Sequence, residues 1–288
     1  MAQQTGRRGL EIRHIAKRYP RTEVLKDINM RLNPGIYGLL GKNGAGKTTL
    51  LKILCGLLKA DAGEVRYCGH DIQSLQEQYR NKVGYLPQKF GCYSTLTAEE
   101  FLFYMAELKG LGREQQRENM EQLIRKAGIA HFRHKKMGQL SGGMRQSVGI
   151  AQALLGDPEI LIFDEPTVGL DPGERMRFQT LVEQLAAEKI IIISTHIISD
   201  IAMIADRVMV LQNGELSLGE RALRKQNKNK VWSCTLPRKE ARLLFAQYAD
   251  ARIVKVEGDR IELHLAADQK PHEKAVRIDS QIEDFFLG

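Results

Sequence analysis

The feature that most constrains this chain is the octapeptide at residues 41–48, Gly-Lys-Asn-Gly-Ala-Gly-Lys-Thr. It fits the pattern Gly-x-x-x-x-Gly-Lys-[Ser/Thr], in which glycines let backbone N–H groups approach phosphate oxygens closely. An apolar stretch at 36–40, expected to be a strand, precedes it, and apolar residues at helical spacing follow it at 50, 51, 54 and 57. This order predicts a loop that holds the phosphates of a nucleoside triphosphate at a helix N-terminus.

The side chains of this loop have distinct expected tasks. Lys47 is expected to reach the β- and γ-phosphates, and the Thr48 hydroxyl is expected to ligate magnesium. The other loop residues expected to contact the nucleotide are Gly41, Asn43, Gly44, Ala45, Gly46 and Thr49. GTPases, kinases and recombinases share such a loop, so it indicates nucleotide binding without choosing among these classes.

Strands and helices are expected to alternate around this loop. Residues 10–33 predict strands with a turn at Tyr19-Pro20, and further strands are expected at 63–67, 82–86, 160–163, 190–194 and 207–211. A charged helical region at about 89–159 interrupts the alternation, and Thr97 with Glu100 forms a capping-box pattern near its start. The chain is therefore expected to be an α/β protein with a mostly parallel sheet and a helical insertion.

Two further motifs make the class specific. Leu-Ser-Gly-Gly-Met-Arg-Gln at 140–146 is followed by Ile-Leu-Ile-Phe-Asp-Glu-Pro-Thr at 160–167. In this order after the phosphate loop, they resemble the signature sequence and the Walker B strand of ATP-binding-cassette (ABC) ATPases. The resemblance covers residues 10 to about 219. It implies a P-loop ABC ATPase domain over 1–219, with a mostly parallel sheet core, an antiparallel β subdomain and a helical subdomain at about 89–159.

The signature implies a dimer. Ser141 is a good N-cap for the helix that follows, and its hydroxyl with the amides of Gly142 and Gly143 would form a second phosphate-binding pole. In the family, this pole contacts the ATP held by a partner's phosphate loop, in a head-to-tail dimer with Asp171 at the interface. Met144 stands where the family usually has glutamine.

The resemblance also implies the residues of hydrolysis. Asp164 would hold magnesium, and Glu165 would be the general base for the attacking water. His196 matches the switch histidine that contacts the γ-phosphate, and Gln88 matches the glutamine that senses magnesium and γ-phosphate. Tyr19 matches the aromatic residue that stacks on adenine, although a tyrosine before a proline is also common in turn packing.

The end of the chain suggests a direction of transport. After a basic linker at 220–230, residues 231–288 are expected to form a small α+β domain, to which we assign no chemistry. The acidic and aromatic tail at 280–287, and the stretch around 195–200, are similar to those of ABC-2 type bacterial exporter ATPases. This similarity implies a peripheral subunit on the cytoplasmic face of a bacterial membrane.

The expected partners are a second ATPase subunit and integral-membrane permease subunits. An importer ATPase, a soluble ABC ATPase that acts on ribosomes or DNA, and a sensor that uses ATP as a switch remain as alternatives. Phe90, Tyr93 and Leu96 either line the groove that receives the membrane subunit or belong to the core of the helical subdomain.

The net charge, the apolar segments and the cysteine spacing indicate which further partners and features are not expected. The net charge is +8, but no stacking or groove-reading motif accompanies it, so nucleic acid is not expected as a partner. No segment has the roughly 18–20 consecutive apolar residues of a transmembrane helix, and no signal peptide is expected. The four cysteines lack metal-binding spacing and are expected to be free thiols.

Overall fold

A computed structural model of the chain describes residues 9–197, 201, 204–218, 230–248, 251–267 and 269–278. The chain divides into two compact units, Met1–Leu216 and Ser217–Gly288. The expected basic linker, apart from Lys230, and the tail at 280–287 lie outside the described residues.

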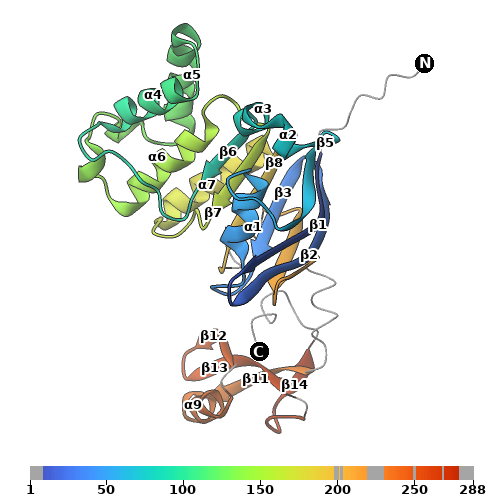
Figure 1. Ribbon diagram of the computed structural model, residues 1–288. Coiled ribbons are helices and arrows are strands. Elements are labelled where there is room, and N and C mark those ends of the chain that lie inside the picture. Colours follow the sequence, from blue (N-terminus) through green and yellow to red (C-terminus); the bar gives the residue numbers. More distant parts are fainter. Residues whose placement is uncertain are drawn as a thin grey trace. The chain divides into compact units, whose positions relative to one another are not determined.

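The first unit opens with an antiparallel sheet in the order β2-β1-β4-β5 (Figure 1). Its strands are β1 (Leu10–Tyr19), β2 (Thr22–Leu32), β4 (Ala62–Tyr67) and β5 (His70–Asp71). Tyr19 pairs with Thr22 across the turn. This confirms the strand–turn–strand expected from the sequence, and the whole sheet is the antiparallel β subdomain implied by the family resemblance.

A second sheet of six strands carries the chemistry-bearing motifs. Its order is β10 (Glu215–Leu218), β9 (Arg207–Gln212), β3 (Gly35–Leu40), β8 (Ile190–Thr195), β7 (Ile160–Asp164) and β6 (Val83–Leu86). The pairs β9–β3, β3–β8, β8–β7 and β7–β6 are all parallel. Every residue of β3, β7 and β8 is buried, as expected for parallel strands with both faces covered.

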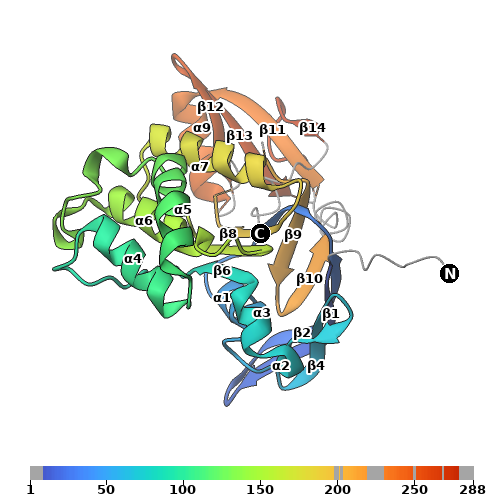
Figure 2. The same cartoon turned by 90° about the horizontal axis from the view of Figure 1, so that it is seen from above.

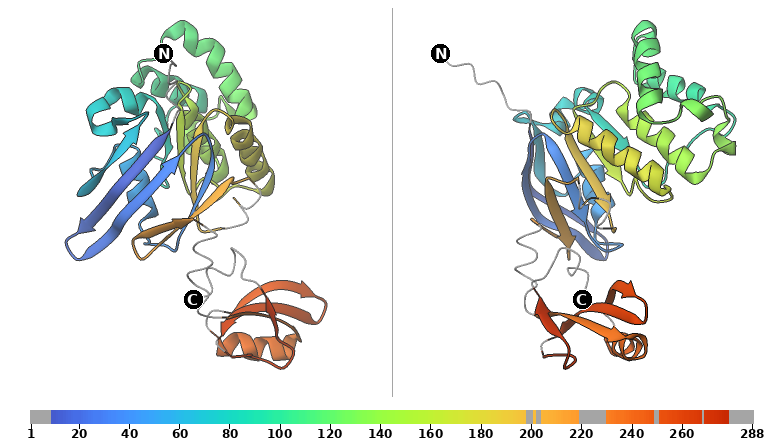
Figure 3. Two further views of the ribbon diagram at one scale, coloured as in Figure 1. Left: turned by 90° about the vertical axis from the view of Figure 1, so that its right-hand side faces the viewer. Right: turned by 180° about the vertical axis from the view of Figure 1, so that it is seen from behind.

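Helices cover both faces of β7. Helix α1 (Lys47–Leu54) shares one core with β1, β2 and the even-numbered residues Ile160 and Ile162 of β7. Helix α7 (Pro172–Leu185) lies on the opposite face, where Phe178 meets Phe163 edge to face at a centroid distance of 5.3 Å (Figure 3). The short helices α2 (Ile72–Leu75) and α3 (Glu77–Asn81) precede β6.

A helical subdomain lies to one side of the sheets (Figure 2). It contains α4 (Ala98–Leu108), α5 (Arg113–Lys126), α6 (Gly142–Leu154) and two short 3-10 turns, Ala130–Phe132 and Met137–Gln139. Its apolar side chains form a core of their own. The capping box is confirmed, because Glu100 Oε2 accepts from Thr97 N at 2.8 Å and Thr97 Oγ1 accepts from Glu100 N at 3.2 Å.

The second unit is an antiparallel sheet with one packed helix. Its strands are β11 (Lys230–Pro237), β12 (Arg252–Glu257), β13 (Arg260–Ala267) and β14 (Val276–Ile278), in the order β12-β13-β11-β14. Helix α9 (Arg238–Gln247) packs on β11 and β13 through a core that includes Leu236, Leu244 and Leu263. The expected α+β character of this unit is confirmed.

Two further expectations concern the cysteines and membrane-spanning helices. All four cysteines are free thiols. Among the described residues, no helix combines the length and the apolar character needed to cross a bilayer.

Candidate active site

The glycine-rich loop joins β3 to α1 and requires glycine where it turns. Gly44 and Gly46 have φ angles of +82° and +103°, a region that disfavours other residues. A Cβ at Gly46 would also lie 2.7 Å from Cγ1 of Val24. Helix α1 then begins at Lys47 without a side-chain cap, so its first-turn amides remain available to an anion.

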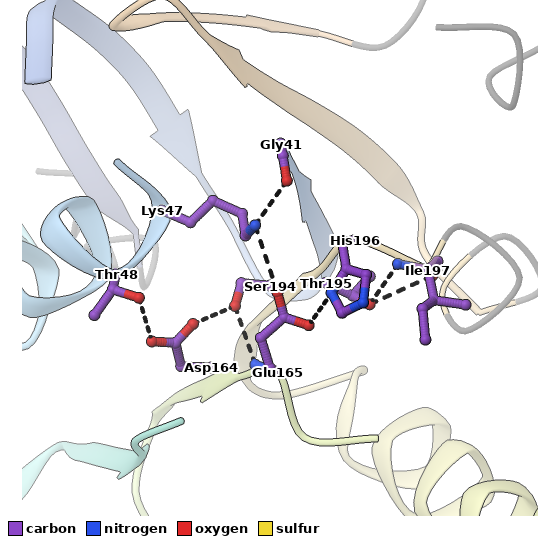
Figure 4. Close-up of polar contacts among 9 residues, drawn as sticks. All are labelled: Gly41, Lys47, Thr48, Asp164, Glu165, Ser194, Thr195, His196 and Ile197. Carbon is purple, nitrogen blue, oxygen red and sulfur yellow. Dashed lines mark hydrogen bonds and ion pairs between the residues drawn. The ribbon is translucent and has the colours of Figure 1, made fainter. Parts of the chain in front are cut away.

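Asp164 ends β7 and is 1% exposed. Its Oδ2 accepts a hydrogen bond from Thr48 Oγ1 at 2.7 Å, and its Oδ1 accepts one from Ser194 Oγ at 2.5 Å (Figure 4). The carboxylate is therefore held from two sides, by the first turn of α1 and by β8. Two hydroxyl donors also satisfy a buried charge that would otherwise be costly to desolvate.

Glu165 follows in the left-handed region, with a φ angle of +55°. Its backbone N–H donates to the Ser194 carbonyl and hydroxyl oxygens, both at 3.1 Å. Its side chain, 3% exposed, lies between a lysine and a histidine. Oε1 is 3.4 Å from Lys47 Nζ, and Oε2 is 2.8 Å from His196 Nδ1 (Figure 4). A non-glycine residue in this region costs about 1–3 kcal/mol, and such strain is typical of functional sites.

Lys47 and His196 thus converge on one carboxylate from different elements. Lys47 is buried and also donates to the Gly41 carbonyl at 2.7 Å, so its side chain folds back over its own loop. His196 follows the last residue of β8 and is about half exposed. Gln88 lies two residues after β6, at the same carboxyl-terminal edge of the sheet, and is exposed.

The signature residues form a separate group. Ser141 is the N-cap of α6, where its Oγ accepts from Met144 N at 3.1 Å. Asp171 is the N-cap of α7 in a capping box with Glu174. Ser141 and Asp171 line a common cavity of about 270 Å³, which shares no lining residue with the Lys47–Glu165 cluster. Tyr19 is exposed at the end of β1.

Comparison with known proteins identifies the family of this chain. A family model described as "ABC transporter" matches residues 25–168, which is half of the chain. The ABC transporter ATP-binding protein YxlF of Bacillus subtilis is 36% identical over 233 residues, covering 80% of this chain and 77% of that protein.

The chain belongs to the ABC transporter family. Like the family's other ATP-binding subunits, it binds and hydrolyses ATP.

Other ABC relatives extend the similarity over nearly the whole chain. The bacitracin transport ATP-binding protein BcrA of Bacillus licheniformis is 31% identical over 291 residues, covering 95% of this chain and 94% of that protein. The Nod factor export ATP-binding protein I of Burkholderia orbicola is 36% identical over 71% of this chain and 68% of that protein.

Solved ABC structures share the fold. The ATP-binding cassette MJ0796, described as dimeric, gives a TM-score of 0.67 at 28% identity, over 72% of this chain and 96% of that one. The same cassette in a post-hydrolysis state with ADP and phosphate gives a TM-score of 0.65, also at 28% identity and over the same shares of both chains. The expected fold class, a P-loop ABC ATPase, is confirmed.

Two contacts of this ABC site were not anticipated from the sequence. Ser194 bonds both Asp164 and the backbone of Glu165, but in the sequence it is one polar residue at the end of an apolar strand. Gln146 Nε2 donates to the Pro166 carbonyl at 3.1 Å, which ties α6 to the segment after β7. Ser194 reaches Asp164 because β7 and β8 pair these two residues in parallel register. No local sequence pattern marks this contact.

Proposed function

We propose that this chain is the motor subunit of a bacterial ABC exporter, which dimerises head to tail around ATP and drives a separate membrane subunit. The observation that carries the proposal is the position of Glu165 between Lys47 and His196, beside the hydroxyl-bound Asp164. This arrangement suits hydrolysis of a phosphate anhydride by a positioned water.

The oxygen donors suit magnesium. Mg²⁺ prefers oxygen ligands, and the Thr48 hydroxyl and Asp164 carboxylate already lie 2.7 Å apart. We assign these two residues and Gln88 to the metal, which when bound would neutralise charge on the phosphate oxygens. The loop residues Gly41 to Thr49 would surround the phosphates, and the exposed ring of Tyr19 would stack on adenine.

Glu165 is assigned as the general base. Its carboxylate oxygen Oε1 lies 3.4 Å from Lys47 Nζ. When Lys47 turns to the phosphates, one oxygen of Glu165 is released and can accept the proton of the attacking water. His196 continues to hold the other oxygen at 2.8 Å and thereby orients the carboxylate.

The second half of each site would come from a partner copy. Ser141 and Gly142 are exposed at the N-terminus of the 13-residue helix α6. A helix N-terminus with free amides favours a phosphate, and Ser141 with the amides of Gly142 and Gly143 would contact the partner's ATP. Asp171, in the same cavity as Ser141, would lie at this interface.

The membrane subunit would dock beside the segment that follows Gln88. Of the three residues left open by the sequence, Phe90 and Leu96 pack against the core of the helical subdomain. Tyr93 is 56% exposed and meets Tyr104 edge to face at 5.4 Å. These two tyrosines are a rigid, exposed aromatic pair of the kind that anchors protein interfaces.

Export is favoured over import by the relative named for Nod factor export. The test is affinity purification of the chain from its native membranes in mild detergent, with partners identified by mass spectrometry. The proposal expects an integral-membrane protein and no solute-binding protein. Recovery of a solute-binding protein would indicate an importer, and recovery of only ribosomes, DNA or soluble proteins would contradict the transport role.

A further inference from the structure

Tyr85 carries a buried polar group that the site described above does not use. Its ring packs against the core between α1 and the sheet. Within the part of the chain that the structure describes, its hydroxyl oxygen is buried and has no hydrogen-bond partner. The hydroxyls of two other tyrosines of this core are satisfied: Tyr79 donates to the Leu54 carbonyl and Tyr67 to Glu159 Oε2, both at 2.5 Å.

An unpartnered buried hydroxyl destabilises a folded protein, whereas phenylalanine would fill the same space without that loss. A buried polar group without a partner needs a specific explanation, and a role beside a bound ion is one of them. For an ATPase, the state to consider is the one with ATP and metal bound.

The sheet register brings Tyr85 beside Asp164. Tyr85 pairs with Ile162 in parallel register, and Asp164 stands two residues further along β7, on the same face. From the usual strand spacing and rise per residue, the Cα atoms of Tyr85 and Asp164 lie about 8 Å apart. A tyrosine side chain can span most of that distance. Burial, and next the charge of Asp164, raise the pKa of Tyr85, so the phenol stays protonated and can donate.

We propose that Tyr85 is a positioning residue for the magnesium site, because its hydroxyl donates to the Asp164 carboxylate, directly or through one water, when ATP and magnesium are bound. The inference rests on the proposed assignment of Asp164 to the metal. Asp164 accepts hydrogen bonds from Thr48 and Ser194. With the Thr48 hydroxyl engaged by a bound metal, Tyr85 would be a neighbouring donor that holds Asp164 in place.

The test compares Tyr85→Phe with wild type in the full chain, by melting temperature without ligands and by stabilisation with ATP as MgCl2 is titrated. The variant should melt no lower than wild type without ligands, and ATP without metal should stabilise both equally. The Mg²⁺ concentration for half-maximal stabilisation should rise about tenfold, as expected for loss of a hydrogen bond to a charged group. Tyr79→Phe is the matched control, and it should lower the melting temperature without changing the Mg²⁺ response.

An equal half-maximal Mg²⁺ concentration in Tyr85→Phe and wild type would overturn the inference. A lower melting temperature of the ligand-free variant would also overturn it, because the hydroxyl would then have a partner. The Asp164→Asn variant separates this inference from its basis. If that variant kept the wild-type Mg²⁺ response, the magnesium assignment itself would fail.

Discussion

Two regions of this cassette, one at the end of β7 and one at the start of α6, are built in opposite ways. In the first, at the end of β7, the carboxylates of Asp164 and Glu165 are almost fully buried and are held by Thr48, Lys47 and neighbouring groups. In the second, at the start of α6, Ser141 and Gly142 are exposed, and the Ser141 hydroxyl accepts from the backbone amide of Met144 in the first turn of its own helix.

The difference indicates how the work is divided. The contacts that hold the buried region all come from one chain. The exposed region lies at a helix N-terminus, and its cavity shares no lining residue with the Lys47–Glu165 cluster. We infer that it is completed only when a second copy brings its nucleotide there. Substitutions in the buried region should therefore impair the hydrolysis step itself. Substitutions in the exposed region should impair assembly of the site that two chains share.

The largest expected effect is on turnover, from Glu165→Gln. The amide keeps the size of the carboxylate but cannot accept the proton of the attacking water. Phosphate release should fall at least about 100-fold, the usual range for a general base. ATP binding and ATP-dependent dimerisation should persist, as measured by equilibrium binding and size-exclusion chromatography. Turnover near that of wild type would contradict the assignment.

Ser141→Ala should reduce turnover roughly 10- to 100-fold, the loss expected for a hydrogen bond to a charged phosphate. It also removes an N-cap, which costs about 1 kcal/mol of stability. Thr97→Ala is a matched control, because it removes the cap of α4 in the same subdomain. Both variants should lose similar stability in urea unfolding. An equal loss of turnover in both would show that Ser141 acts only as a cap.

Ser194→Ala tests the preorganised region. It removes the donor to Asp164 Oδ1 and one acceptor of the Glu165 amide, both buried. Loss of a buried partner predicts a decrease of about 1–3 kcal/mol in the free energy of unfolding. Ser74→Ala, which removes an exposed hydroxyl that donates to the Asp71 carbonyl, should change stability much less. Equal effects in denaturant unfolding would contradict the role given to Ser194.

The smallest expected effect is at Tyr19. Loss of aromatic stacking in Tyr19→Ala should weaken ATP binding about 5- to 10-fold, whereas Tyr19→Phe should bind as wild type. Fluorescent-nucleotide titration measures both. If Tyr19→Ala lowered the melting temperature without changing ATP affinity, Tyr19 would only pack the turn between β1 and β2.

The sequence predicted those parts of the site that depend on short segments. The phosphate loop has a local pattern, and Asp164 with Glu165 follows an apolar strand. Thr97 with Glu100 is likewise a local cap, which the structure confirms. Contacts that depend on strand order were not predictable, because Ser194 reaches Asp164 only through the pairing of β7 with β8. The positive φ angle of Glu165 could not be predicted from the sequence either, because glutamate rarely adopts such an angle.

The most direct test of the shared site is complementation between two inactive variants. Lys47→Ala damages the phosphate loop. Gly142→Asp places a negative charge at the signature, where a Cβ meets no atom of the described residues within 4 Å, so α6 should still fold. The account predicts that each variant alone is inactive. A 1:1 mixture should recover roughly a quarter of wild-type ATP hydrolysis, because half of the dimers would hold one intact site of two. If the mixture stayed as inactive as its components, a site shared between two chains would be contradicted.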